Sequence, residues 1–304
     1  MPRVSVIIPA FNAEAHIAET LRSVGAQTYD DWEVVLADDR STDATVEIAT
    51  KFGERVKIVR SAKNAGPSAA RNLGIAHASG ELLAFLDADD YWLPAYLEHQ
   101  VGLFDESRQA RLNVGIVACN ALVLGPQGFL TRTYGDYIGH PKKVTLARLL
   151  ASNPIFVSAL SPRAVVDEAG GFCPGMLAED HDLWLRIVEL GYRVVATRSP
   201  LAVHRLSSGS MSADPAKMAR ASQRVYRRAL ERGNLSARER RVARRELRGQ
   251  RAVERIASAD GISYRQILKA LPLVALVAVE HPKRWRSFAR AAVRGHLGFD
   301  RFAL

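Results

Sequence analysis

The stretch Leu82-Leu83-Ala84-Phe85-Leu86-Asp87-Ala88-Asp89-Asp90 joins an apolar run to a cluster of aspartates. The run Leu82–Leu86 has the length and composition of a buried strand. Asp87 and Asp89 are two residues apart, so in an extended segment they project to the same side. Two converging carboxylates repel one another unless a cation or a proton lies between them. The stretch therefore predicts a buried strand that ends in an acidic site.

Similar apolar runs precede this strand, and helix-like segments separate them. The expected strands are Val4–Ile8, Glu33–Ala37 and Val56–Val59, and the expected helices span residues 14–26, 42–51 and 67–78. Alternating strands and helices with nearly continuous apolar strands are typical of a parallel sheet covered by helices on both faces. Such a sheet binds ligands outside the carboxyl ends of its strands, where Asp38-Asp39 and the Asp87–Asp90 cluster are expected to lie.

The later chain is less regular. Val114–Leu124 is expected to add a strand to the same sheet, and residues 125–178 predict irregular loops that face a substrate. A helix near 179–190 and a short strand at Tyr192–Ala196 follow. Residues 215–256 predict helix, rich in Arg and Ala.

The formal net charge of +10 conceals an asymmetry. Residues 205–304 carry 23 Lys and Arg against 8 Asp and Glu, whereas residues 1–204 carry 19 basic and 24 acidic side chains. A mildly acidic body and a basic C-terminal part suggest two different partners. The two cysteines, Cys119 and Cys173, indicate a reducing compartment, and no secretory signal or membrane-spanning stretch is visible. We therefore expect a cytoplasmic protein.

An all-carboxylate site predicts a hard divalent cation, because Mg²⁺ takes one or two carboxylates with phosphate oxygens and water. A structural role stays open, since aspartates after strands also form turns and cap helices. There is no G-x-G-x-x-G and no G-x-x-x-x-G-K-[ST], which disfavours dinucleotide-binding and P-loop proteins. Arg71 is a candidate for neutralising diphosphate charge, although a solvated surface arginine would have the same signature.

Five motifs in this order resemble the family 2 inverting glycosyltransferases, which have the GT-A fold. The motifs are Val4–Asn12, Asp38–Asp43, Asn64–Gly74, Phe85–Asp90 and Glu179–Arg186. The resemblance covers residues 4–186 and says little about residues 215–304. It implies an α/β fold with a Rossmann-like, mostly parallel sheet. It also implies an enzyme that moves a sugar from a nucleotide-diphosphate donor, such as a UDP- or dTDP-sugar, to an acceptor hydroxyl with inversion, in polysaccharide or glycoconjugate synthesis.

The resemblance also implies roles for individual residues. Asp180 would be the catalytic base with Glu179 beside it, although the residue pattern alone equally fits an acid at a helix start. Asp89 and Asp87 would hold Mg²⁺ or Mn²⁺, with Asp87 also facing the ribose or the sugar. Asp39, with Asp38 as the alternative, would bind the pyrimidine base. Further donor contacts would come from Pro9, Ala10, Phe11, Asn12, Glu14, Asn64, Gly66, Arg71 and Ala88.

Two departures from the family pattern matter. Arg40 stands where the family usually has Gly, which predicts either a looser turn after Asp39 or a contact of Arg40 with the donor. His204 and Ser207 stand where the family usually has Tyr and His, so a ligand role for that His does not carry over to Ser207. Three further candidates for the site are His204, Arg205 and Trp184.

We expect a catalytic domain over residues 1–214, with a nucleotide-sugar half (1–124) and an acceptor half (125–214), followed by a basic helical extension (215–304). The extension predicts contact with an anionic membrane surface near a glycan or lipid-linked acceptor on the cytoplasmic face. Ile267–Val279 suits the membrane interface, and Trp285 and Arg286 are placed like interfacial anchors. The alternative is a core helix and arginines on a solvated face.

Two other functions are less consistent with the sequence. A nucleotidyltransferase of the same fold would carry a basic loop after its first strand, and Pro9–Glu14 contains no basic residue. A nucleic-acid-binding protein could use residues 217–256, which hold 14 Lys and Arg against 4 Asp and Glu. Tyr226 is the only aromatic residue of that segment, which disfavours base stacking.

Overall fold

The N-terminal apolar runs form the parallel half of one sheet. The structure, a computed structural model, describes residues 1–139, 144–206 and 214–258. Strands β1 (Val4–Ala10), β2 (Trp32–Asp38), β3 (Val56–Arg60) and β4 (Leu82–Phe85) lie in the order β3-β2-β1-β4 and pair in parallel. Each strand expected in this region is present, and the carboxyl ends of the strands lie along one edge of the sheet.

Helices α1 (Ile17–Gly25), α2 (Thr45–Thr50) and α3 (Pro67–His77) connect these strands and confirm the expected alternation. Helix α3 begins directly after Gly66, whose φ of 86° is a conformation that glycine adopts without strain. Further along, Gly74 lets the helix approach β1, because a Cβ there would come within 2.8 Å of Ile7. This close approach holds α3, and with it Arg71, against the sheet.

The second half of the sheet is mixed, which differs from the expected mostly parallel arrangement. It contains β5 (Tyr91–Trp92), β6 (Val114–Gly125), β7 (Gly128–Phe129), β8 (Ala159–Pro162) and β9 (Arg193–Arg205). Strand β8 lies between β4 and β6 and is antiparallel to both, β9 is parallel to β6, and β5 and β7 are antiparallel to their neighbours. The parallel part thus carries the acidic clusters expected at the strand ends. The mixed part extends the same sheet beyond β4.

Residues 125–178, expected to be irregular, contain short regular elements. Besides β7 and β8 these are α5 (Tyr134–Ile138), α6 (Leu146–Ala151) and α7 (Arg163–Glu168). Helices of five or six residues give no hydrophobic period of their own, so sequence patterns do not reveal them. The longer helix α4 (Tyr96–Gln109) lies between β5 and β6 and was not expected either.

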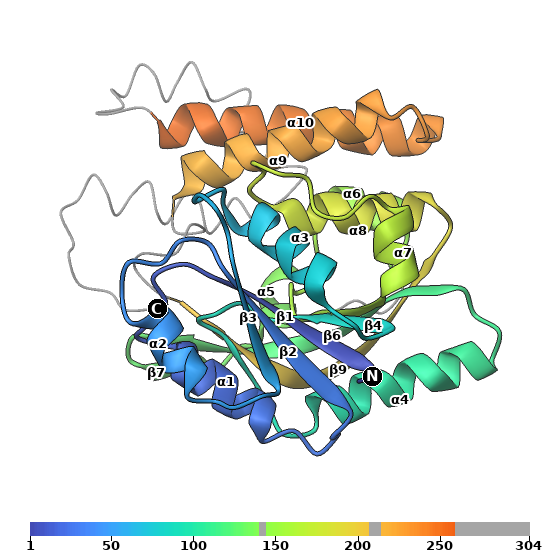
Figure 1. Ribbon diagram of the computed structural model, residues 1–304. Coiled ribbons are helices and arrows are strands. Elements are labelled where there is room, and N and C mark those ends of the chain that lie inside the picture. The colour runs from blue at the N-terminus through green and yellow to red at the C-terminus, as the bar shows by residue number, and fades with distance from the viewer. Residues whose placement is uncertain (140–143, 207–213, 259–304) are drawn as a thin grey trace.

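The helices at the C-terminal end of the described chain pack on the rest of the protein. Helix α8 (Glu179–Glu189) is followed after β9 by α9 (Pro215–Glu231) and α10 (Ala237–Ala257), so the expected helix 215–256 is divided in two. Gly233, with a φ of 79°, lies in the connection. Figure 1 shows α10 along the outside of the molecule; it packs on α9 and α6, and α9 packs on α8.

Two apolar clusters hold the layers together, one on each face of the sheet. One cluster packs strand residues such as Ile7 and Phe85 against helices α3, α6, α7 and α8. It also includes Val225 of α9 and Leu247 of α10. The other joins the opposite strand faces to α1 and α4. Residues 215–257 therefore share one core with the sheet. Among the described helices none is both long and apolar enough to cross a membrane; Ile267–Val279, Trp285 and Arg286 lie outside the described residues.

Candidate active site

The loops after β1 and β2 are tied together by hydrogen bonds. The amide of Asn12 donates to Oγ of Ser41 at 3.0 Å, and the side-chain oxygen of Asn12 accepts from the Thr42 amide at 2.9 Å. Glu14 accepts from a backbone amide at the start of α2 at 3.0 Å. Phe11, directly before Asn12, is half exposed. The residues after β1 thus form one ordered rim with an aromatic ring open to a ligand.

Asp38 and Asp39 both follow the buried core of β2 but have different surroundings. Asp38 is fully buried, and one of its carboxylate oxygens lies 2.9 Å from Nε of Arg60. Asp39 accepts from the backbone amides of Ala65 and Gly66 at 2.7 to 3.1 Å. Asp38 therefore has no surface for a ligand, whereas Asp39 connects the end of β2 to the loop that leads into α3.

Three turns that border the site contain non-glycine residues in the left-handed conformation. They are Asn12, Arg40 and Ala178, with φ values of 48°, 69° and 57°; the fourth such residue in the described chain is Arg111. Each conformation of this kind costs on the order of 1–3 kcal/mol and is retained where the surroundings enforce it. The expectation of a looser turn at Arg40 is therefore wrong, because Arg40 adopts the backbone conformation that glycine would have.

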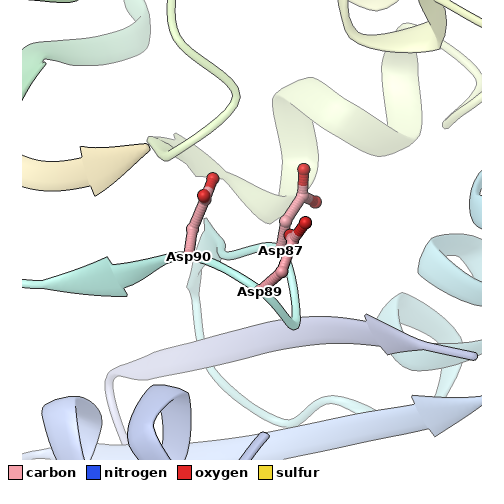
Figure 2. A group of neighbouring side chains, drawn as sticks. All are labelled: Asp87, Asp89 and Asp90. Atoms are coloured by element: carbon pink, nitrogen blue, oxygen red, sulfur yellow. The ribbon is translucent and has the colours of Figure 1, made fainter. Parts of the chain in front are cut away.

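The aspartates after β4 converge in a turn rather than in an extended segment. The amide of Asp90 donates to the carbonyl oxygen of Asp87 at 3.2 Å. Carboxylate oxygens of Asp87, Asp89 and Asp90 all lie within 4.8 Å of one another. Figure 2 shows the three side chains pointing to the same side of the loop. The turn thus adds Asp90 to the expected pair, whereas an extended strand would have placed Asp90 on the opposite side.

Residues at the end of β9 brace this acidic turn. Nδ1 of His204 lies 3.3 Å from the carboxylate of Asp90, and the backbone amide of Arg205 donates to the same carboxylate at 2.8 Å. Nε of Arg205 donates to the carbonyl oxygen of Asp89 at 2.9 Å. His204 and Arg205 therefore both contact the acidic turn. Ser207, at the position of the family's usual His, lies outside the described residues.

Arg71 links the acidic turn to α8. Its side chain is 3% exposed, and its guanidinium donates to both Asp87 and Glu179. The guanidinium also lies over the ring of Phe172, 5.3 Å from its centroid. Burial alone would lower the pKa of Arg71, but the carboxylates of Asp87 and Glu179 raise it well above its usual value. Arg71 is therefore a buried cation and not a solvated surface arginine.

Asp180 lies in the first turn of α8, directly after Glu179. Its carboxylate accepts from Nδ2 of Asn153 at 3.0 Å and is partly buried. Burial raises the pKa of Asp180 and the charge of Asp87 raises it further, while Arg71 and the hydrogen bond from Asn153 oppose the shift. A carboxylate with a raised pKa is a stronger proton acceptor, as general-base chemistry requires.

Negative charge dominates the acidic turn. Burial and the neighbouring Asp87 raise the pKa of Asp89. Burial also raises the pKa of Asp90 to about 6, although the hydrogen bond to His204 opposes the shift. Raised pKa values in a group of carboxylates indicate a shortage of positive charge. A hard divalent cation prefers such an all-oxygen donor set, so the residues present fit Mg²⁺ or Mn²⁺.

Sequence patterns missed one side chain of the site and placed another where no ligand reaches. Asn153 has no signal beyond the Asn153-Pro154 turn, although it contacts Asp180. Trp184 is fully buried, with its ring centroid 6.1 Å from that of Phe85, which is a core position. The remaining expected donor residues are Pro9 and Ala10 at the end of β1, exposed Asn64 before α3, and buried Ala88 within the acidic turn.

Comparisons with known proteins agree on one class of enzyme. The sequence model described as Glycosyl transferase family 2 matches residues 5–123. A glycosyltransferase of Bacillus subtilis named for teichuronic acid biosynthesis, TuaG, is 30% identical over 233 residues, which cover 74% of this chain and 88% of the relative. A relative from Escherichia coli, named UDP-Glc:alpha-D-GlcNAc-diphosphoundecaprenol beta-1,3-glucosyltransferase WfgD, is 30% identical over 70% of this chain and 81% of its own length.

Solved structures support the fold. S. aureus TarS, crystallised with UDP-GlcNAc, superposes with a TM-score of 0.65 at 20% identity over 91% of this chain and 81% of its own. The mannosyltransferase PcManGT of Pyrobaculum calidifontis, in complex with GDP-Man and Mn²⁺, superposes with a TM-score of 0.65 at 22% identity over 98% and 88%. The mixed sheet with its acidic strand-end turn thus has the GT-A fold. The chain belongs to glycosyl transferase family 2.

Proposed function

We propose that this glycosyltransferase moves a sugar from a nucleoside diphosphate to an acceptor hydroxyl with inversion at the anomeric carbon. The observation that carries the proposal is the pair of contacts made by Arg71 with Asp87 and Glu179. The buried guanidinium of Arg71 thus connects the acidic turn after β4 to the start of α8, where Glu179 and Asp180 lie. A donor diphosphate at the turn would therefore present its sugar next to Asp180.

The donor nucleotide is assigned to the rim made by the loops after β1, β2 and β3. Phe11 offers an exposed ring, and Asn12 is held by its hydrogen bonds to Ser41 and Thr42. Asp39 lies among the backbone amides of the loop before α3, where a base amide could share its carboxylate. The names of the Escherichia coli relative and of the TarS complex support a UDP-sugar as donor.

Asp89 and Asp87 are the residues assigned to a divalent cation, Mg²⁺ or Mn²⁺. The cation would neutralise diphosphate charge as the leaving group departs. Asp90 is assigned a structural role beside them, because its carboxylate already accepts a hydrogen bond from the Arg205 amide and contacts His204. The Mn²⁺ in the PcManGT complex is consistent with this assignment.

Asp180 is assigned as the general base of a single displacement. Its carboxylate takes the proton of the acceptor hydroxyl while the hydroxyl oxygen attacks the anomeric carbon and the bond to the diphosphate breaks. One displacement without a covalent intermediate inverts the configuration. Arg71 holds Glu179, and Asn153 orients Asp180, so the base is preorganised on the first turn of a helix.

The acceptor is proposed to be a lipid-linked glycan used in polysaccharide or glycoconjugate synthesis. The name of the Escherichia coli relative specifies a diphosphoundecaprenol-linked acceptor, and the Bacillus subtilis relative is named for a cell-surface polymer. Residues 125–178, of which α6 and α7 pack against α8, are the part of the chain expected to select the acceptor.

The test is a screen of labelled nucleotide sugars for hydrolysis and for transfer to undecaprenyl-diphosphate-linked sugars, with Mn²⁺, with Mg²⁺ and with a chelator. We expect one UDP-sugar to be consumed in a metal-dependent reaction. Release of the sugar with inverted configuration supports the mechanism. A retained configuration would overturn the single displacement, and turnover unaffected by the chelator would overturn the metal assignment.

A further inference from the structure

One face of α10 presents a row of arginines. Helix α10 contains Arg241, Arg244, Arg248, Arg251 and Arg255, all of them exposed. Their spacing of three, four, three and four residues places them within about 80° of the helix circumference and along about 21 Å of its length. The opposite side is buried against α9 and α6. We call these five residues the arginine face.

The arginine face has no compensating negative charge in the described part of the chain. None of its five side chains makes an ion pair or hydrogen bond with a described carboxylate. The three glutamates of α10 have other partners: Glu239 caps the helix start at Ser236, buried Glu246 pairs with Arg245, and Glu254 contacts Gln223 and Arg220 of α9. Like charges three or four residues apart destabilise a helix by a few tenths of a kcal/mol per pair. The repulsion between these arginines therefore costs some helix stability.

The surface is rigid. A capping box of Ser236 and Glu239 fixes the first turn of α10, and Gln223 of α9 contacts the Gln250 carbonyl and Glu254. Figure 1 shows α10 lying along the outside of the molecule, where it packs on α9 and on α6. The helix that carries the five arginines is thus anchored to the protein, and the arginine face lies on its exposed side.

We propose that the arginine face binds the anionic phospholipid surface of a membrane. Guanidinium groups bind phosphate with paired hydrogen bonds, and each basic side chain near an acidic leaflet contributes on the order of 1 kcal/mol. A nucleic acid fits less well, because residues 237–257 contain no aromatic side chain for stacking. No large apolar residue lies within the row, so binding is electrostatic, reversible and weakened by salt. The inference stands independently of the donor, metal and base assigned above.

Sedimentation of the full-length protein with vesicles tests the proposal. Phosphatidylcholine vesicles with and without phosphatidylglycerol are compared at low and high salt. One variant carries Arg241→Gln, Arg244→Gln, Arg248→Gln and Arg251→Gln. A charge-matched control carries Arg22→Gln, Arg108→Gln, Arg193→Gln and Arg198→Gln, all at exposed positions away from α10.

We expect the wild-type protein to sediment only with anionic vesicles and to be released by salt. The α10 variant should bind at least tenfold more weakly, whereas the control should lose less than threefold. Thermal melting should show both variants folded; if the fourfold α10 variant unfolds, Arg244→Gln with Arg251→Gln takes its place. The proposal is overturned if the wild type ignores anionic vesicles or if both variants lose binding equally. It is also overturned if the α10 variant loses binding to duplex RNA while no variant binds vesicles.

Discussion

Nη1 of Arg232, directly after α9, lies 3.1 Å from Oδ1 of Asp182 in α8, and the side chain of Asp182 is completely buried. Arg186 and Arg228 contact the same carboxylate at 2.9 and 3.2 Å. Asp182 lies only two residues after Asp180. Arg228 and Arg232 therefore anchor the first turn of α8, which carries the assigned base Asp180. They are paired inside the protein, whereas the arginine face of α10 is exposed.

Arg232→Ala should lower the free energy of unfolding by about 3 kcal/mol. The substitution leaves the buried carboxylate of Glu189 without its two-bond partner and weakens the contact with Asp182. Arg227→Ala, at an exposed position of α9, should cost less than about 0.5 kcal/mol. Chemical denaturation of both variants measures the difference. Equal stability of the two would mean that the buried ion pairs do not hold α9 in place.

Asp180→Asn should leave UDP affinity within about twofold and reduce turnover at least about a hundredfold, because it removes a proton acceptor and little binding. Steady-state kinetics and calorimetric titration separate the two effects. A variant with nearly normal turnover would make Asp180 a helix-start residue. Glu179 would then be the next candidate for the base, despite its contact with Arg71.

Asn153→Ala should move the acid limb of the kcat/KM profile to higher pH. The pKa of Asp180 is already raised by burial, so activity is lost as the pH falls through that raised value. The hydrogen bond from Asn153 opposes the shift, and its removal should raise the pKa further. A pH profile of both proteins with saturating metal makes the comparison. A limb that moves to lower pH, or does not move, contradicts the assignment.

Asp89→Asn should weaken binding of UDP in the presence of Mn²⁺ at least about tenfold, because it removes a charged ligand from the acidic turn. Asp87→Asn should do the same and also free one side of Arg71. Titration of UDP with and without Mn²⁺ provides the measurement, and thermal melting confirms folding. Unchanged affinity in both variants would rule out a metal at this turn.

Arg40→Gly should keep or raise stability, within about 1 kcal/mol, because glycine adopts the left-handed conformation of Arg40 without strain. Arg40→Asn, which also tolerates this conformation, should behave alike. Since the arginine is exposed beside the donor rim, both variants should bind UDP several-fold more weakly. If affinity is unchanged while stability rises, Arg40 has no part in donor binding.

Much of the parallel half of the sheet follows from local sequence. Continuous apolar runs form β1 to β4, and the aspartates that follow β2 and β4 lie at strand ends as expected, because parallel strands place their carboxyl ends at one edge. The short elements of residues 125–178 have no recognisable hydrophobic period in the sequence. The position of β8 could not be predicted either, because β8 pairs with β4 and β6, which are distant in the chain.

The sequence by itself determined the parallel layers, the order of the motifs and the basic character of the C-terminal part. Only the tertiary structure decided which charges meet. It buries Arg71 between Asp87 and Glu179, brings Asn153 to Asp180, and assigns Arg232 to an internal ion pair while Arg244 stays at the surface. The physical reason is that burial and electrostatic pairing depend on groups that are far apart in the chain. Residue types and local spacing do not show which of these groups come into contact.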